Sequence, residues 1–447
     1  MQRLQQLTVW LQGQFPGEKF SLAPASSDAS FRRYFRVSFD DGGCDSANGS
    51  LQSSGEPVGL PPAGRLLMEP LADRLNEQTT LAKSLVMAKP ADCGNSRQAT
   101  PSAPDNSTVT HRGGRTLIVM DAPPDREDCR PFLHVARLFE KAGTHVPHVY
   151  AEDLTQGFLL LSDLGNTTYL QALSLREQQG IHRLTPCEED NARKLYHAAT
   201  DALIKIQLAS NDRDLPPYDE ALLLREMRLF PEWYINKHLQ VTLTPAQNAK
   251  LETVFARIVA NNLAQPRVYV HRDYHSRNLM LVEPNGQARF PLSNPLPNTG
   301  EGANESLREN CLTSPGILDF QDAVYGPITY DLVSLFKDAY IKWDEEIVID
   351  WLIDYWEKAR RARLPVPEDF GQFYRDFELM GAQRHLKVLG IFARLYHRDG
   401  KDGYLKDMPL VMNYLRAACA RYVDLKPLFN LLNELEPPEA PPTGYGF

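Results

Sequence analysis

Two short segments of this 447-residue chain constrain its fold more than any other feature. The first reads His271-Arg-Asp-Tyr-His-Ser-Arg-Asn278 and follows the apolar run Val268-Tyr-Val270, so it predicts a tight loop leaving a buried strand. The second, Gly316-Ile-Leu-Asp-Phe-Gln-Asp322, predicts a strand end with a carboxylate projecting from it. A helix with apolar periodicity follows, with Asp331 near its start. Together the two segments supply carboxylates and an amide to one site.

These groups are the ones that phosphoryl transfer from Mg-ATP requires. An Asp in such a loop accepts the proton of the acceptor hydroxyl, and an Asn five residues later binds Mg²⁺. A second Asp, on the next strand, holds Mg²⁺ against the phosphates. The pattern assigns these roles to Asp273, Asn278 and Asp319 respectively. Since the transferred phosphoryl group is already electrophilic, the protein mainly has to neutralise charge and align the hydroxyl.

Composition argues against several other classes of protein. The net charge is −9 and no long basic run occurs, which speaks against a nucleic-acid partner. No apolar run is long enough to span a membrane, and the first ten residues predict an amphipathic helix. The six cysteines are scattered without a C-x-x-C pair, so we expect free thiols in the cytoplasm. We also expect a monomer.

Two polar intervals predict insertions. Residues 40–114 are rich in Gly, Ser, Pro and Asn at both ends and separate predicted strands at 30–38 and 116–120, so we interpret them as an insertion in a β-hairpin. Residues 284–315 predict a loop insertion between the two catalytic segments. Both insertions are expected at the surface, away from the cleft. The small residues at 23–30 predict a turn.

The remaining pattern changes from strand-like to helical along the chain. Apolar residues at helical spacing predict helices at 128–142 and 191–209, and nearly everything after Asp331 is typical of helices. A β-rich N-terminal nucleotide-binding lobe at 1–165 and a mostly helical catalytic and substrate-binding lobe at 166–447 are therefore predicted. The fold class is α+β and bilobal, with ATP in the cleft.

Several longer segments, spread from about residue 20 to residue 430, carry a family resemblance. They are Asp28–Arg36, Val119–Pro124, Glu127–Pro131, Leu160–Gly165, Leu215–Glu220, Phe230–Tyr234, His271–Asn278 and Asp319–Pro327. On these segments the chain resembles the aminoglycoside-phosphotransferase and choline-kinase superfamily. Within that superfamily it is similar to the bacterial anomeric kinases of N-acetylmuramate and N-acetylglucosamine. The two insertions are not part of the pattern.

The resemblance implies a protein-kinase-like fold and phosphorylation, by ATP and Mg²⁺, of the C1 hydroxyl of N-acetylmuramate and/or N-acetylglucosamine in peptidoglycan-sugar recycling. Two alternatives stay open. One is another small-molecule kinase with an aminoglycoside or choline-like acceptor, whose site would need many carboxylates or an aromatic cage. The other is a regulatory nucleotide-binding pseudokinase, against which the intact Asp273, Asn278 and Asp319 argue.

One departure from the wider kinase pattern concerns the ATP phosphates. Met120 stands near the position at which a phosphate-binding Lys is expected. Arg32 and Arg33 are predicted to replace it, the alternative being that they are solvated strand charges. The predicted nucleotide-binding residues are Ser30, Arg32, Arg33, Ser162 and Leu164.

Further residues are predicted to support the catalytic groups or to bind the acceptor. His271 is expected to brace the loop, and Asp331 either to cap its helix or to hold the loop backbone. The predicted acceptor-binding residues are His275, Arg277, Tyr218, Asp219, Glu226, Trp233, Tyr234, Gln321 and Asp322. For these, the alternatives are a supporting role beside the catalytic groups or, for the aromatic ones, a place in the core.

Overall fold

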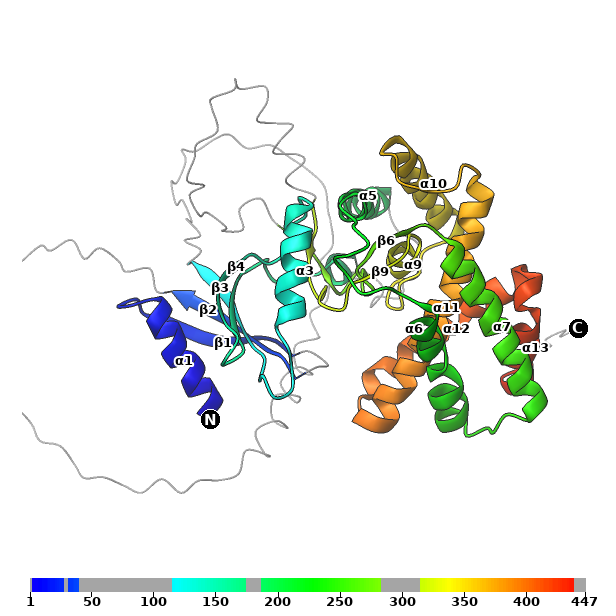
Figure 1. The fold of residues 1–447 in the computed structure, drawn as a ribbon, viewed down its shortest axis with the longest axis horizontal. Coiled ribbons are helices and arrows are strands. Elements are labelled where there is room, and N and C mark those ends of the chain that lie inside the picture. Colours follow the sequence, from blue (N-terminus) through cyan, green and yellow to red (C-terminus); the bar gives the residue numbers. More distant parts are fainter. Residues whose placement is uncertain (1, 28–30, 40–114, 174–185, 283–313, 438–447) are drawn as a thin grey trace, which may run out of the picture. The chain divides into compact units, whose positions relative to one another are not determined.

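The computed structural model describes residues 2–27, 31–39, 115–173, 186–282 and 314–437, which belong to one compact unit of the chain (Figure 1). The predicted insertion at 40–114 lies outside the described residues. The same holds for the predicted loop insertion at 284–315, except for Ser314 and Pro315. The proposed lobe boundary near residue 165 stays a prediction.

The N-terminal part is an antiparallel sheet with the strand order β1-β2-β3-β5-β4. Its strands are β1 (Phe20–Ser27), β2 (Arg33–Phe39), β3 (Thr116–Asp121), β4 (Val149–Asp153) and β5 (Phe158–Ser162). The central strands are rich in β-branched and aromatic residues, which favour a pleated, half-buried surface.

The first strand corrects the turn predicted at residues 23–30, because the chain is already extended from Phe20 to Ser27. β1 pairs with β2 along its length, with a bulge between Pro24 and Ser26. Proline has no backbone N–H to donate, so Pro24 fits at this edge strand and bulge. Hydrogen bonding to β2 therefore outweighs the turn-like composition of residues 23–27.

The two faces of the sheet carry different layers. Helix α1 (Gln2–Gln14) packs Leu7 and Leu11 into a cluster with Val37, Val119 and Leu160 of the strands. The opposite face belongs to the main core, to which helix α3 (Arg130–Lys141) contributes (Figure 1). Since successive side chains of a strand point to opposite faces, residue parity decides which layer each strand residue meets.

The C-terminal part is mostly helical. Its helices are α4 (Tyr169–Leu173), α5 (Pro186–Leu208), α6 (Glu220–Met227), the π-helix η2 (Phe230–His238), α7 (Pro245–Ala264), α9 (Tyr330–Phe336), α10 (Glu345–Arg361), α11 (Phe370–Asp399), η3 (Asp402–Asp407), α12 (Met408–Arg421), η4 (Val423–Leu425) and α13 (Lys426–Leu435). The long α11 packs against η2, α9, α7, α6 and α12, and most of its middle residues are buried. At Gly390 a Cβ atom would lie 2.4 Å from the carbonyl carbon of Leu229, so glycine permits the close approach of α11 to the start of η2.

Two short antiparallel ladders frame the predicted catalytic loop. β6 (Arg267–Val270) pairs with β9 (Val324–Pro327), and β7 (Leu279–Met280) pairs with β8 (Gly316–Ile317). The loop therefore leaves β6 and ends in β7, while Asp319 lies two residues after the end of β8. Chain segments about forty residues apart meet at one place.

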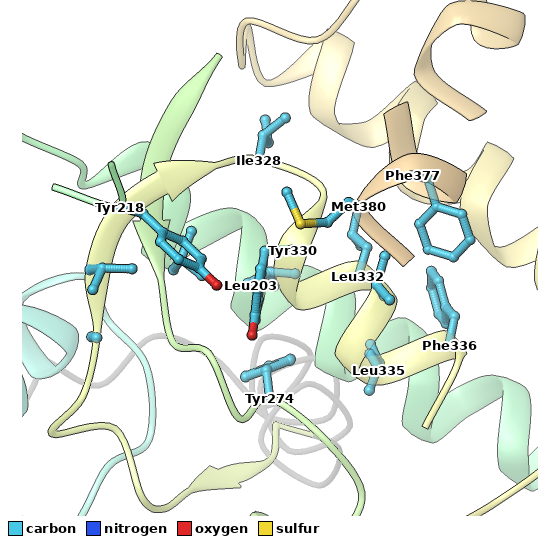
Figure 2. Packing of buried hydrophobic residues seen from close by; sticks show 14 of the residues in the cluster. Leu203, Tyr218, Tyr274, Ile328, Tyr330, Leu332, Leu335, Phe336, Phe377 and Met380 are labelled. Atoms are coloured by element: carbon cyan, nitrogen blue, oxygen red, sulfur yellow. The ribbon is translucent and has the colours of Figure 1, made fainter. Parts of the chain in front are cut away.

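The core beneath these ladders combines aromatic and aliphatic side chains. Figure 2 shows Tyr218 and Tyr330 beside each other, with Met380 and Phe377 of α11 nearby. The predicted α+β fold, with a β-rich N-terminal lobe and a mostly helical C-terminal lobe, is confirmed. Among the described residues, no helix is long and apolar enough to cross a membrane.

Candidate active site

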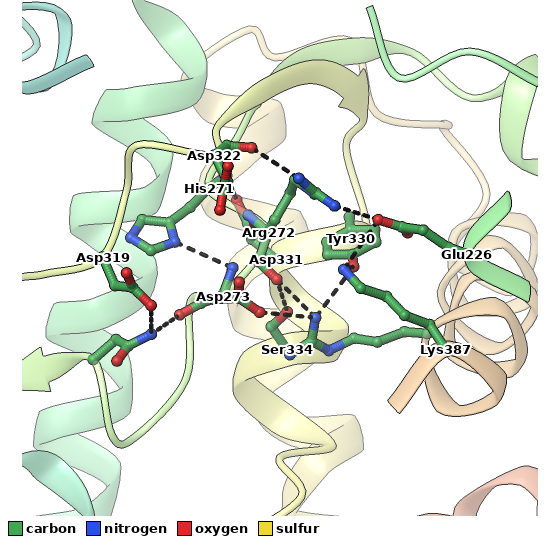
Figure 3. Close-up of polar contacts among 12 residues, drawn as sticks. Glu226, His271, Arg272, Asp273, Asp319, Asp322, Tyr330, Asp331, Ser334 and Lys387 are labelled. Atoms are coloured by element: carbon green, nitrogen blue, oxygen red, sulfur yellow. Dashed lines mark hydrogen bonds and ion pairs between the residues drawn. The ribbon is translucent and has the colours of Figure 1, made fainter. Parts of the chain in front are cut away.

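The loop between β6 and β7 is held by Asp331 from below (Figure 3). The backbone N–H of His271 donates to Oδ2 of Asp331 at 2.7 Å, and that of Arg272 donates to Oδ1 at 3.0 Å. Arg272 has φ +78°, a left-handed conformation that is costly for a non-glycine residue. The N-cap of α9 is Thr329, not Asp331. Asp331 was predicted either to cap its helix or to hold the loop backbone, and the structure shows it holding the loop backbone.

His271 braces the same loop. Its Nε2 lies 3.0 Å from the carbonyl oxygen of Leu318, and its Nδ1 accepts the backbone N–H of Asp273 at 3.2 Å. The ring is fully buried, and burial lowers its pKa to about 4. A neutral imidazole that donates from Nε2 and accepts at Nδ1 satisfies both contacts, so His271 ties the loop to the segment after β8.

The three predicted chemical groups lie together. The side-chain amide of Asn278 donates to the carbonyl oxygen of Asp273 at 3.0 Å and to Oδ2 of Asp319 at 3.4 Å. Gln321 donates to Oδ1 of Asp319 at 2.7 Å. Asp319 has φ +63°, a second strained residue at the site. The predicted trio of Asp273, Asn278 and Asp319 is thus brought to one place by the two ladders.

This donor set suits Mg²⁺. Asp319 would supply one carboxylate and Asn278 one amide oxygen, which is enough for an ion that keeps most of its other positions for phosphate oxygens and water. Among the described residues, no group of three or more His, Cys, Asp or Glu side chains forms a metal cage. A cage of that kind would suit a structural metal rather than a Mg²⁺ that arrives with a nucleotide.

Asp273 carries a partly exposed carboxylate, 39% accessible, among cations. Burial alone would raise its pKa, but the charges of Lys387, Arg384 and neighbouring groups outweigh it and hold the pKa below its usual range. The carboxylate is therefore ionised at neutral pH. It is well placed to orient a hydroxyl, and it is a weak base until that hydroxyl has begun to react.

A cavity of about 450 Å³ opens beside Asn278 and Asp319. Ser162, Leu164 and Arg277 line it as well, so five of its lining residues were predicted to bind nucleotide, metal or acceptor. The remaining lining includes many apolar side chains, among them Tyr34, Ile118, Phe132, Leu161, Met280, Leu318 and Phe320. Apolar walls with a few polar groups at one end are typical of a site for a flat aromatic base with a charged tail.

The cation on the sheet side of this cavity is Arg36, which the sequence analysis did not select. β2 places Tyr34 and Arg36 on the cavity face, because residues two apart share a face. Arg33 has the other parity and pairs with Asp121, the partner of Arg3 in α1. Its position therefore does not support the predicted phosphate contact.

The other predicted nucleotide-binding residues have mixed placements. Arg32 lies 4.0 Å from the carboxylate of Glu127, the residue that also accepts the backbone N–H of Phe31. Ser162 uses its hydroxyl to accept the backbone N–H of His148 at 2.9 Å. Ser30 lies outside the described residues. The alternation of side chains along β2 is the sequence signal that indicates Arg36. The prediction instead chose Arg32 and Arg33, the arginines nearest the turn, to replace the missing Lys.

Two predicted acceptor-binding residues flank the catalytic loop. The guanidinium of Arg277 stacks on the ring of Tyr340, 3.6 Å from its centroid, and lies 4.0 Å from the carboxylate of Asp407. His275 meets Tyr340 edge-on at 5.5 Å, and burial lowers its pKa. Both side chains are positioned by packing beside the catalytic groups. Contact with an acceptor stays a prediction for them.

Glu226 and Tyr218 lie deeper than predicted. Glu226 is 5% exposed and accepts hydrogen bonds from the hydroxyl of Tyr218 and the guanidinium of Arg272, and Lys387 lies 3.2 Å away (Figure 3). Arg272 also donates to the carbonyl oxygen of Asp322 at 3.3 Å. The hydrogen-bonding capacity of Glu226 is thus used within the protein, which favours a supporting role.

The last three predicted acceptor-binding residues hold structural positions. Asp219 caps α6, accepting the backbone N–H of Leu222 at 2.9 Å. Tyr234 is buried and donates to Glu436 at 2.8 Å, and Trp233 packs against the main core. The alternative of core aromatics therefore describes these two residues better than a sugar-stacking surface.

Comparison with known proteins agrees with this site. The sequence model of the phosphotransferase enzyme family matches residues 101–288 and 313–365. An N-acetylmuramate/N-acetylglucosamine kinase of Neisseria meningitidis is 38% identical over 447 residues, covering the whole of both chains. A protein of the same name from Pseudomonas aeruginosa is 46% identical over 323 residues, which are 72% of this chain and 83% of that one.

Solved structures also align with the chain. A GDP complex of an aminoglycoside 2′-phosphotransferase aligns with a TM-score of 0.47 and 10% identity, over 93% of this chain and 97% of that one. A choline/ethanolamine kinase family protein from Mesorhizobium loti aligns with a TM-score of 0.43 and 12% identity, over 71% and 87%. The family match and the full-length relative confirm the resemblance seen in the sequence motifs. The chain belongs to the phosphotransferase enzyme family.

Proposed function

We propose that this protein transfers the γ-phosphoryl group of ATP to the anomeric C1 hydroxyl of N-acetylmuramate and/or N-acetylglucosamine, in the recycling of peptidoglycan sugars. The observation that carries the proposal is the meeting of Asp273, Asn278 and Asp319, of which Asn278 and Asp319 line the 450 Å³ cavity. The choice of acceptor rests on the relatives, one of which aligns over the whole chain.

In the proposed reaction the Asp273 carboxylate accepts a hydrogen bond from the C1 hydroxyl. This contact directs the hydroxyl oxygen at the γ-phosphorus. An anomeric hydroxyl is more acidic than an ordinary sugar alcohol, so one carboxylate suffices as the base. The transition state of phosphoryl transfer is loose, so the position of the attacking hydroxyl matters most. The proton moves to Asp273 late in the reaction for the same reason. A low pKa of Asp273 is compatible with such a late transfer.

Asn278 and Asp319 would hold Mg²⁺, which supplies neutralisation of the phosphate charge when bound. Their own position is fixed by the loop, by Gln321 and by the β7–β8 ladder. Arg36 and Arg277 line the cavity, and in this proposal they bind the triphosphate or the acceptor carboxylate. Because the reaction consumes ATP, we place it in the cytoplasm.

An aminoglycoside or choline-like acceptor is the second candidate within the family. Such cations call for a dense acidic rim or an aromatic cage. Around the catalytic loop Glu226 is consumed by internal contacts with Arg272 and Lys387. The relatives named N-acetylmuramate/N-acetylglucosamine kinase favour an amino-sugar acceptor over such cations.

Phosphorus NMR of the product tests the proposal. The protein is incubated with MgATP and either amino sugar, and Asp273→Asn serves as the inactive control. We expect an acid-labile phosphate whose ³¹P signal is coupled to the anomeric proton, and no phosphorylation of kanamycin or choline. A phosphate at C6, or turnover with amine acceptors alone, would overturn the assignment.

A further inference from the structure

Helix α11 sends two buried cations toward the catalytic loop. Arg384 and Lys387 are each 6% exposed, and they lie one helical turn apart on the same face of α11. Both reach the hydroxyl of Tyr330, at 3.2 Å from Arg384 and 3.0 Å from Lys387 (Figure 3 shows Lys387 and Tyr330). Burial of two cations is costly unless each has specific partners.

The main partner of Arg384 is the strained residue of the catalytic loop. Its Nη1 donates to the carbonyl oxygen of Arg272 at 2.7 Å. The N–H of Arg272 is already held by Asp331, and its guanidinium by Glu226. The N–H, the guanidinium and the carbonyl oxygen of Arg272 are therefore all held. Arg384 of α11 holds the carbonyl oxygen. A left-handed non-glycine residue persists only when its surroundings hold it in this way.

The same guanidinium faces the proposed base. Nη1 of Arg384 lies 3.8 Å from Oδ1 of Asp273, too far for a direct hydrogen bond and close enough for a strong charge interaction. One side chain thus contacts the peptide that precedes Asp273 and the carboxylate of Asp273.

We propose that Arg384 is a positioning residue for phosphoryl transfer, holding the Arg272 peptide and the Asp273 carboxylate in the orientation that the acceptor hydroxyl requires. Lys387 supports it by bridging Tyr330 and Glu226, the carboxylate that anchors the Arg272 side chain. The inference deepens the proposed function and rests on it for the identity of the acceptor alone. The positioning itself is a property of the loop.

Charged and titratable groups surround Asp273 from every neighbouring element. The loop contributes Arg272 and His275, α11 contributes Arg384 and Lys387, and α9 contributes Asp331. Four of these groups act to lower the pKa of Asp273, and the nearest fixed charge is that of Arg384. Removal of Arg384 therefore takes away both the hydrogen bond to the Arg272 peptide and the charge nearest the Asp273 carboxylate.

The test compares Arg384→Met, Arg384→Lys and a matched control on the same helix, Arg375→Met. Arg375 pairs with Asp424 at 2.8 Å, away from the loop. For Arg384→Met we expect kcat to fall about 10²-fold, the usual effect of misplacing a reacting group. KM for MgATP should stay at the wild-type value, because Arg384 does not line the cavity beside Asn278 and Asp319.

The lysine variant separates charge from geometry. Arg384→Lys keeps a cation but loses the planar fork that reaches Arg272. We expect kcat to remain low in Arg384→Lys, although a positive charge is kept near Asp273. Wild-type kcat in Arg384→Met would overturn the proposal, as would equal losses in Arg375→Met.

If Arg384→Met does not fold, Tyr330→Phe decides the question, because it removes only the hydroxyl shared by Arg384 and Lys387. A fall in kcat at unchanged KM for MgATP supports positioning, and wild-type kcat refutes it. The wild-type protein is assayed first, so inactivity toward both amino sugars marks a failure of the proposed function instead. In that case the ¹³C chemical shift of the Asp273 carboxyl near neutral pH, assigned with Asp273→Asn, is compared between the wild type and Arg384→Met without any acceptor. A changed shift supports positioning by Arg384, and an unchanged shift refutes it.

Discussion

Arg36 and Asp163 form a two-point ion pair in the wall of the cavity. Nε of Arg36 lies 2.6 Å from one carboxylate oxygen of Asp163 and Nη2 lies 3.0 Å from the other. Nη2 also donates to the carbonyl oxygen of Gly165 at 3.2 Å. The pair connects β2 to the chain that leaves β5, and it holds a guanidinium in the lining of the cavity.

Arg36→Met should therefore weaken MgATP binding, by roughly tenfold or more, because a charge-assisted contact is lost. Isothermal titration calorimetry with MgATP measures the effect. Arg33→Met is the matched control, since Arg33 lies on the opposite face of the same strand and pairs with Asp121. It should keep the wild-type Kd. Equal losses in the two variants would show that the effect is one of sheet stability.

Asp273→Asn should leave folding and MgATP binding intact while turnover falls by ~10²–10⁴-fold, the range for loss of a general base or orienting group. An amide is similar in shape but accepts no proton. Steady-state turnover and nucleotide binding, measured on the same preparation, check the prediction. Near-normal turnover would remove Asp273 from the mechanism.

Asp319→Ala should abolish Mg²⁺-dependent nucleotide binding, because it removes the carboxylate that neutralises the ion. Gln321→Ala is the control, since it takes away only the amide that donates to Oδ1 of Asp319. Nucleotide binding is titrated with and without Mg²⁺ for each variant. An Asp319→Ala protein that binds MgATP like the parent would make Asp319 a structural residue only.

The buried carboxyl of Asp331 predicts a pH dependence of stability. Burial raises its pKa to about 7, although the two loop N–H donors act in the other direction. In the unfolded chain its pKa is about 3.9. The folded state thus holds the proton more tightly, so protonation of Asp331 stabilises the fold fully below about pH 4, and this contribution is lost as the pH rises to about 7.

Asp331→Asn does not titrate and serves as the reference. The stability of the wild-type protein relative to this variant should therefore fall as the pH rises from about 4 to about 7. Urea denaturation of both proteins across that window measures the difference. A difference that is constant with pH, or that grows toward pH 7, would show that Asp331 is ionised throughout.

Much of this architecture was predictable because its signals are local. The apolar strand before His271, the spacing from Asp273 to Asn278 and the short strand before Asp319 are all contained within a few residues. The helices followed from apolar periodicity, with α3 and α5 close to their predicted ranges. In each case propensity, pattern and tertiary structure agree.

The remaining features depend on contacts between distant residues. β1 forms because β2 offers it a partner, and its own composition favours a turn. Arg384 reaches Arg272 across 112 residues of sequence, so no spacing could reveal it. Tyr234 and Glu226 have residue types that suit a sugar site, and only the packing of η2 and α6 shows that their polar atoms are used inside. Residue type alone does not say which way a side chain points.

The ends of the first predicted insertion bear on whether it is dispensable. Ser38 pairs with Thr116, and the N–H of Phe39 donates to the carbonyl oxygen of Arg115 at 3.1 Å, so the chain returns to the place it left. Removing residues 44–110 and joining the ends through a short glycine-containing turn should therefore preserve the β2–β3 ladder.

We expect this shortened protein to fold and to phosphorylate the amino sugars with the kcat and KM values of the full chain. The predicted catalytic trio and the cavity lining all lie among residues that the deletion keeps, from Ala25 to Arg36 and from Ile118 to Phe320. Circular dichroism and thermal unfolding establish that the fold is intact before activity is compared. A folded protein with a raised KM for MgATP would contradict the prediction, since it would mean that residues 44–110 contribute to the nucleotide site.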